Sequence, residues 1–338
     1  MLCLHSPIQH LHRPGRIMRR NEFVQARDVP ERGEALLAAV RADGHQIAEA
    51  ADHGLDPIAA IHTPEYLDFL RTAFDAAGGQ EDVYATVFPV RHMGARYPVH
   101  VAGRAGWHMH DLMAPVGRHT WQAAVAAANL AADAAGRVLA GTRVVYALCR
   151  PSGHHAFTDM GGGSTYLNNA AIAAQVLRRG HDRVALIDID THHGNGTQGI
   201  FYDRADVFFA SLHRDPVDAH PYFTGHAHET GAGAGEGYTL NLPLPATTDD
   251  AAYLSALETA CARIAAFRPG ALVVSLGFDA HEADPSDHMA LTYDGFTRIG
   301  ARLAALGLPT VLVQEGGYNV DGIGRCLSRF LAGFEAAL

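Results

Sequence analysis

The chain has 338 residues and is short of cysteine, of basic side chains and of long hydrophobic runs. Its four cysteines show no Cys-x-x-Cys spacing, which excludes a disulfide scaffold and favours reduced thiols. The chain has only 26 basic residues against 36 acidic ones, so the net charge is −10. This balance argues against a nucleic-acid partner, because binding to phosphate needs clustered basic side chains.

No stretch approaches the roughly 20 apolar residues of a membrane-spanning helix. Residues 1–20 also lack the apolar run of a signal peptide. We therefore expect a cytoplasmic protein with no membrane partner. Met18 is an alternative start of translation, so Met1 and Met18 both remain possible first residues.

Short, continuously apolar segments alternate with helical segments from about residue 120 onward, which predicts a parallel sheet covered on both faces. Residues 87–117 are rich in Pro, Gly, His and Arg and are expected to form a long loop. We prefer one α/β domain with a decorated loop over two domains. The predicted strands are 144–149, 184–189, 207–212, 272–276 and 310–313, and the predicted helices are 30–42, 64–74, 121–140, 168–179, 250–267, 293–306 and 320–337.

Polar clusters follow four of the predicted strands. Ligands bind at the carboxyl ends of the strands in an open parallel sheet, so these clusters mark a candidate site. A single cluster of this kind would be weak evidence, whereas four successive ones are hard to attribute to chance. The clusters are residues 150–155, 188–196, 277–281 and 314–319.

The segment after the second of these strands offers metal ligands. Asp190 and His192 alternate along an extended stretch and point to the same side. Asp279, from another strand, would complete a three-ligand catalytic site with open positions for water and substrate. Zn²⁺ is the first candidate, with Fe²⁺ or Co²⁺ as alternatives. The competing interpretation is that Asp190 and His192 cap a helix or pair locally.

The remaining clusters offer proton carriers and an oxyanion donor. His154 and His155 are adjacent and follow a glycine, and Asp188 and Asn195 are suitable partners for their second ring nitrogens. Tyr318 follows Gly316 and Gly317, a pair that lets the backbone approach a ligand closely. Taken alone, the two histidines are better explained as ordinary turn residues, and Tyr318 is equally well explained as a tyrosine packed at a loop.

Together these motifs resemble the histone deacetylase and acetylpolyamine amidohydrolase superfamily, from about residue 87 to the end of the chain. The resemblance is strongest in residues 150–155, 188–198, 211–213, 275–285 and 315–319. Residues 88–91, 120–121 and 168–171 point to the bacterial acetylpolyamine amidohydrolase branch.

The resemblance implies an arginase/deacetylase-like fold over residues 1–338, with a central, mostly parallel eight-stranded sheet. Residues 90–117 would be an inserted loop at the entrance of the active site and an interface of a homodimer or higher homo-oligomer. It implies zinc ligands at Asp190, His192 and Asp279 and an oxyanion-stabilising Tyr318. His154 and His155, backed by Asp188 and Asn195, would be the catalytic histidines, the second acting as general base and acid.

The resemblance also implies two sites for monovalent cations. A structural K⁺ would be held by groups of Asp188, Asp190, His192, Ser211 and Leu212. A second site, built mostly from backbone carbonyls, would lie near Phe201, Arg204, Val207 and Tyr238.

The substrate-binding residues depart from the family pattern. Family members usually flank the acyl channel with two aromatic residues, and the aligned positions here, beside Gly163 and before Pro221, are Ser164 and His220. Asp111 is the only acidic residue in the segment 101–113, where the polyamine enzymes bind the distal ammonium group. Together with Gly316 and Gly317, these are the candidate substrate-binding residues. Arg104, His108 and His110 in the same segment would favour an anionic or bulky acyl compound.

The sequence therefore predicts a metal-dependent amidohydrolase for a small N-acyl amine, with acetylpolyamines first. Deacetylation of acyl-lysine in proteins and hydrolysis of another N-acyl metabolite are the alternatives. A ureohydrolase is a weaker alternative, because that activity would need two bridged metals. A non-catalytic acyl-ligand-binding or scaffold protein is a remote alternative. Such a protein would be expected to lack a metal ligand or the oxyanion-stabilising tyrosine of the family, and this sequence has all of them.

Overall fold

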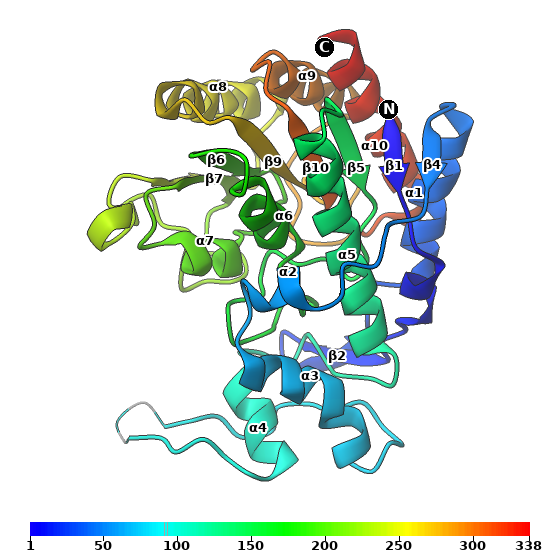
Figure 1. The fold of residues 1–338 in the computed structure, drawn as a ribbon, viewed down its shortest axis with the longest axis vertical. Helices are drawn as coiled ribbons and strands as arrows, with labels where there is room; N and C mark the ends of the chain where they lie inside the picture. The colour runs from blue at the N-terminus through cyan, green and yellow to red at the C-terminus, as the bar shows by residue number, and fades with distance from the viewer. Residues whose placement is uncertain (91, 93) are drawn as a thin grey trace.

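One eight-stranded parallel sheet forms the centre of the computed structural model, which describes residues 1–90, 92 and 94–338 (Figure 1). The strands lie in the order β4-β1-β5-β10-β9-β6-β7-β8, and every neighbouring pair is parallel. A separate antiparallel pair joins β2 and β3. The strands are β1 (Leu2–Leu4), β2 (Arg16–Arg19), β3 (Glu22–Gln25), β4 (Gln46–Ala48), β5 (Val144–Ala147), β6 (Val184–Asp188), β7 (Val207–Arg214), β8 (Thr239–Leu244), β9 (Ala271–Leu276) and β10 (Thr310–Gln314).

Helices cover both faces of this sheet. Side chains alternate between the faces along each strand: Val145 and Ala147 pack in one apolar cluster, while Tyr146 packs in the other. The first cluster includes α5 (Thr120–Leu139) and α6 (Asn169–Leu177), and the second includes α1 (Pro30–Ala42), α8 (Asp250–Phe267), α9 (Tyr293–Ala304) and α10 (Val320–Ala336). The predicted α/β class and parallel eight-stranded sheet are confirmed.

Several elements were not predicted from the sequence. The strands β1 and β4 have only three residues each, too few to show a pattern. The edge strand β8 reads Thr-Leu-Asn-Leu-Pro-Leu and is only partly buried, and a proline is tolerated there because an edge strand has no partner on one side. The short helices α2 (Asp56–Ala59) and α7 (Asn195–Phe201) were also missed, and α3 spans Pro64–Ala76.

The expectation of a loop over residues 87–117 is wrong in part, because it contains the helix α4 (Val101–His108). His100 caps this helix by accepting a hydrogen bond from the Ala102 N–H. Gly106 allows α4 to lie against residue 87, where an added Cβ would be only 1.6 Å from the Val87 carbonyl oxygen. Arg91 and Met93, within the predicted insertion 90–117, lie outside the described residues. The proposed role of the insertion in a homo-oligomer stays a prediction. The organisation of the chain as a single domain also stays a prediction.

The described part of the chain contains no helix that is both long and apolar enough to span a membrane. All four cysteines are buried with free thiols, as their spacing predicted.

The sheet order brings the predicted site together. The four strands that are followed by polar clusters, β5, β10, β9 and β6, are consecutive neighbours in the sheet. Because they are parallel, their carboxyl ends lie at the same edge.

Candidate active site

Asp190, His192 and Asp279 form a cluster with the geometry of a metal site. Their ligand atoms all lie within 4.8 Å of one another, and all three side chains are buried. The His192 Nδ1 atom lies 3.2 Å from Asp190 Oδ1 and 3.1 Å from Asp279 Oδ2. The Gly316 N–H donates to Asp190 Oδ2 and the Thr191 N–H donates to Asp279 Oδ1, so both carboxylates are held in place.

The electrostatics of this cluster fit a bound divalent cation. Burial, together with the nearby Asp190 charge, raises the pKa of Asp279 to about 7. Two buried carboxylates that face each other are costly unless a positive charge lies between them. Two carboxylate oxygens and one imidazole nitrogen form a donor set that suits Zn²⁺ or Fe²⁺.

His154 and His155 lie next to this cluster, with ring centroids 4.0 Å apart. His154 Nδ1 is 2.9 Å from Asp188 Oδ2, and His155 Nδ1 is 2.7 Å from Asn195 Oδ1. Burial alone lowers the pKa of His154, but Asp188 and Asp190 raise it to about 10. Burial and then the charge of His154 lower the pKa of His155 well below its usual value. The pair therefore combines a charged first ring with a neutral second ring.

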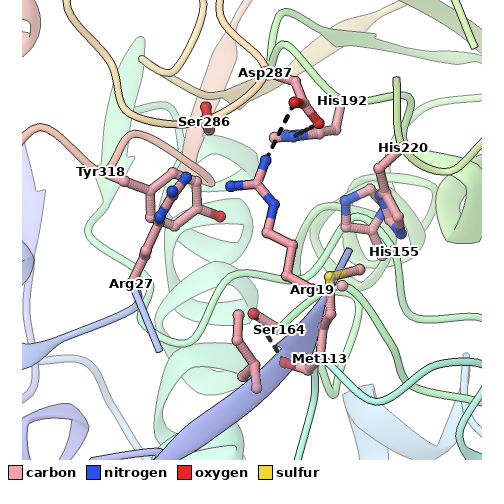
Figure 2. A pocket seen from close by; sticks show the side chains of 12 residues that line it. Arg19, Arg27, Met113, His155, Ser164, His192, His220, Ser286, Asp287 and Tyr318 are labelled. Carbon is pink, nitrogen blue, oxygen red and sulfur yellow. Dashed lines mark hydrogen bonds and ion pairs between the residues drawn. The ribbon is translucent and has the colours of Figure 1, made fainter. Parts of the chain in front are cut away.

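Tyr318 lies on the opposite wall of the same cavity (Figure 2). The Asp284 carboxylate accepts hydrogen bonds from the Tyr318 and Asn319 N–H groups, at 2.6 and 3.1 Å, and so fixes the backbone that carries the ring. Burial raises the pKa of Tyr318 well above its usual value, so the phenol keeps the proton that it would donate.

Two buried residues that position this site were missed from the sequence. Glu315 Oε2 accepts hydrogen bonds from the Gly153 and His154 N–H groups, at 2.7 and 3.2 Å. Arg32, on α1, donates to the carbonyls of Glu315 and Gly317 and to Asp28. Glu315 stood inside a predicted cluster, but Arg32 belongs to a predicted helix more than 100 residues before the site. No local pattern distinguishes this arginine from one exposed to solvent.

The candidate substrate-binding residues lie around the cavity, but several of their polar groups are already bonded. Ser164 Oγ donates to the Met113 carbonyl at 3.0 Å. Asp111 accepts hydrogen bonds from the Gly163 and Met113 N–H groups, and His220 Nε2 is 3.6 Å from its carboxylate. The His220 ring meets the His155 ring edge to face at 4.8 Å.

The basic residues of the segment before Asp111 differ in how near they lie to the cavity. Arg104 donates to Asp68 on α3 at 2.8 Å, and the Nδ1 atom of the buried His108 donates to the Asp159 carbonyl, so both are turned away from it. His110 Nε2 donates to the His155 carbonyl, and its ring lines the adjoining hollow together with Asp111 and His220.

The residues of the expected monovalent sites lie on β6, α7, β7 and the segment before β8. Asp188 and Ser211 are paired across β6 and β7, and Leu212 follows Ser211 along the strand. In the second group, the Phe201 carbonyl accepts from the Arg204 N–H and the Tyr238 carbonyl accepts from the Phe209 N–H, each at 3.0 Å. Val207 is the first residue of β7.

The walls of this cavity carry groups from both ends of the chain. His155, His192 and Tyr318 line it, as do Arg19 and Arg27 from the N-terminal segment. A parallel sheet with an Asp-His-Asp cluster, two histidines and a tyrosine at one edge is the arrangement of a hydrolase with an α/β fold.

The chain belongs to the histone deacetylase family: residues 26–334 match the histone deacetylase domain. It is 44% identical to an acetylpolyamine amidohydrolase of Burkholderia pseudomallei (strain 1710b), over 99% of both chains. It is also 44% identical to the acetylpolyamine amidohydrolase of Mycoplana ramosa, over 92% of this chain and 93% of that one.

Solved structures agree with this assignment. The crystal structure of acetylpolyamine aminohydrolase from Burkholderia pseudomallei superposes with a TM-score of 0.96 at 43% identity, over 100% of this chain and 99% of that one. The HD domain of HDA15 superposes with a TM-score of 0.83 at 27% identity, over 99% of this chain and 89% of that one.

Proposed function

We propose that this hydrolase is a zinc-dependent deacetylase of small N-acetylated amines, the class to which acetylpolyamines belong. The observation that carries the proposal is that His192, a member of the Asp190–His192–Asp279 cluster, lines the same cavity as His155 and Tyr318. The names of the two bacterial relatives support the substrate class.

His155 is the proton carrier in this proposal. Its Nδ1–H donates to Asn195 Oδ1, which leaves the lone pair of Nε2 free to accept a proton. Its lowered pKa keeps it neutral at pH 7, the form that a general base needs. After water has attacked the amide carbonyl, the same nitrogen returns the proton to the leaving amine, and acetate and a free amine result.

His154 and Tyr318 stabilise charge in this reaction. His154 is charged through its bond with Asp188, so it places a positive charge beside the reacting centre without exchanging its proton. The Tyr318 hydroxyl donates a hydrogen bond to the oxygen that becomes negative when the carbonyl is attacked.

Asp190, His192 and Asp279 would hold the metal, which when bound polarises the amide carbonyl and lowers the pKa of water. Zn²⁺ is the proposed ion, with Fe²⁺ or Co²⁺ as alternatives for the same donor set. We further propose a structural K⁺ at Asp188, Ser211 and Leu212, and a second monovalent cation near Phe201, Arg204, Val207 and Tyr238.

The metal and the chemistry can be tested together. The protein is stripped with a chelator, reloaded with Zn²⁺, Fe²⁺ or Co²⁺, and assayed with N-acetylputrescine, N-acetylcadaverine, an acetyl-lysine peptide and a trifluoroacetyl-lysine reporter. We expect about one ion per chain and turnover that returns only with metal. Asp279→Asn should lose both the ion and the activity while keeping the fold.

Full turnover by the stripped protein would contradict the proposal. Turnover of the acetyl-lysine peptide in preference to the free amines would favour the acyl-lysine alternative, and turnover of the reporter alone would favour another N-acyl metabolite. A loaded protein that binds acylated amines without cleaving them would be the non-catalytic alternative.

A further inference from the structure

Two arginines from the N-terminal segment form part of the wall of the active-site cavity. Arg19 ends β2, and Arg27 follows β3, so the β2–β3 hairpin places both beside the reacting groups. Figure 2 shows the Arg19 side chain crossing the cavity between Tyr318 and His155. The proposed chemistry uses neither side chain.

Arginines outnumber carboxylates around this wall, because Asp284 and Asp287 face the three guanidinium groups of Arg19, Arg20 and Arg27. Among the described residues, Asp287 is the one carboxylate that lines the cavity itself, and it pairs with Arg19 at 3.2 Å and with Arg20 at 2.8 Å. It also lies 3.9 Å from His192 Nε2. One partly exposed carboxylate is therefore shared by two guanidinium groups and an imidazole.

Among the residues that the structure describes, no carboxylate lies within ion-pair distance of Arg27. Its guanidinium donates to the Pro285 carbonyl, a neutral acceptor. Burial, followed by the charge of Arg19, lowers the pKa of Arg27, which shows how closely the two cations face each other. The charges of Asp284 and Asp287 act on Arg27 in the opposite sense, but among the described residues neither forms an ion pair with it, and the Asp284 carboxylate accepts from the N–H groups of Tyr318, Asn319 and Ser286.

The cavity also offers little to a distal ammonium group. Asp111 is the candidate for that role, but its carboxylate is already bonded to the Gly163 and Met113 N–H groups and faces His220. A polyamine would bring a second positive charge into a cavity whose wall carries two arginines. A carboxylate would instead bind between guanidinium groups that fit it geometrically.

We propose that the preferred substrate is an N-acyl amine with a carboxylate next to the scissile amide, as in an Nα-acyl amino acid, and that Arg19 and Arg27 bind this carboxylate. The inference rests on the proposed deacetylase function and narrows its substrate class. The carboxylate is placed next to the amide because both arginines line the same small cavity as His155 and Tyr318.

Four matched substrates test the proposal with the zinc-loaded protein. N-acetylputrescine has no carboxylate, Nδ-acetylornithine adds one at the far end, Nα-acetylornithine adds one beside the amide, and N-butylacetamide carries no charge. We expect kcat/KM for Nα-acetylornithine to exceed each of the others by at least about tenfold, the scale of one charged hydrogen bond.

Variants assign the effect to the arginines. Arg19→Gln and Arg27→Gln should each reduce the preference for Nα-acetylornithine over N-butylacetamide by about tenfold or more. Arg20→Gln is the matched control, because it removes a guanidinium from the same Asp287 but from a side chain that is 67% exposed. Since each preference is a ratio within one variant, partial unfolding does not change it.

The outcomes are distinct. Faster turnover of N-acetylputrescine, N-butylacetamide or Nδ-acetylornithine would overturn this proposal and leave the deacetylase function standing. An unchanged preference in both Arg19→Gln and Arg27→Gln would also overturn it. Failure to cleave any of the four amides would remove the proposed function and this inference with it.

Discussion

The adjacent residues His154 and His155 have opposite pKa shifts although they share one turn. Asp188, a carboxylate, keeps the first ring charged, whereas Asn195, an amide, leaves the second ring neutral. Asp188 ends β6 and Asn195 follows it, so the difference between the two histidines arises from the tertiary structure and not from local sequence.

Tyr318→Phe tests the oxyanion role at the scale of one atom. Removing the hydroxyl should lower kcat on the order of 10²–10³, the loss typical of one oxyanion donor. The thermal midpoint and the bound metal should not change, because the backbone bonds to Asp284 do not involve the hydroxyl. Steady-state kinetics and metal analysis check this. Tyr202→Phe, outside the cavity, is the control, and near-full turnover by Tyr318→Phe would refute the role.

At the scale of elements, the site depends on contacts between the ends of neighbouring strands. β5 and β10 are adjacent, and Glu315, just after β10, accepts two N–H groups of the turn that follows β5. Arg32 holds the same β10 segment from α1. The catalytic turn is therefore positioned by side chains from two other elements.

Glu315→Leu should leave two buried N–H groups without acceptors, at a cost of about 1–3 kcal/mol each in the free energy of unfolding. It should also lower kcat, because the His154–His155 turn loses its support. Glu315→Gln keeps an acceptor oxygen, so it should retain most of the stability and most of kcat. Chemical denaturation and kinetics of the two variants separate these effects, and equal activity of Leu and wild type would contradict the positioning role.

The same side chain predicts a pH dependence of stability. Burial raises the pKa of Glu315 from 4.5 to about 7. Between these values the folded protein keeps the proton that the unfolded chain releases, so this residue makes stability fall as pH rises from about 4.5 to 7. Glu315→Gln should lack this fall, which thermal melts over that pH range would measure.

At the scale of the whole molecule, the first residues contribute to the middle of the fold. β1 lies between β4 and β5 in the central sheet, and Arg150, beside the catalytic turn, donates to the carbonyls of Gln9 and His12. Figure 1 shows the N-terminal strand inserted beside β5, which follows it by about 140 residues.

A chain that begins at Met18 should therefore be strongly destabilised. It would lose β1, expose the edges of β4 and β5, and leave two buried donors of Arg150 unpaired. We expect the free energy of unfolding to fall by at least about 3 kcal/mol, which denaturant titration would measure. Deleting the exposed Ala337 and Leu338 should change little. A stable, active chain starting at Met18 would contradict this reading.

Most of the fold's periodic elements could be predicted from the sequence, because strands buried on both faces are continuously apolar and helices carry caps such as Thr63 and Thr292. The short strands β1 and β4 could not, since three residues show no period. The helix α4 was missed because it contains Gly103 and Gly106, and glycine is normally unfavourable in helices. These glycines let α4 lie close to Pro98 and Val87, a contact that only the structure shows.

The sequence by itself determined the chemistry: it identified the α/β class, the four polar strand ends and the residues Asp190, His192, Asp279, His155 and Tyr318 that meet there. These residues could be recognised because each lies in a polar cluster after the end of a strand. Only the tertiary structure decided which other side chains reach the site. Arg19, Arg27 and Arg32 come from segments more than 100 residues earlier in the chain, and their positions depend on how the hairpin and α1 pack against the sheet edge. No local pattern in a sequence contains that information.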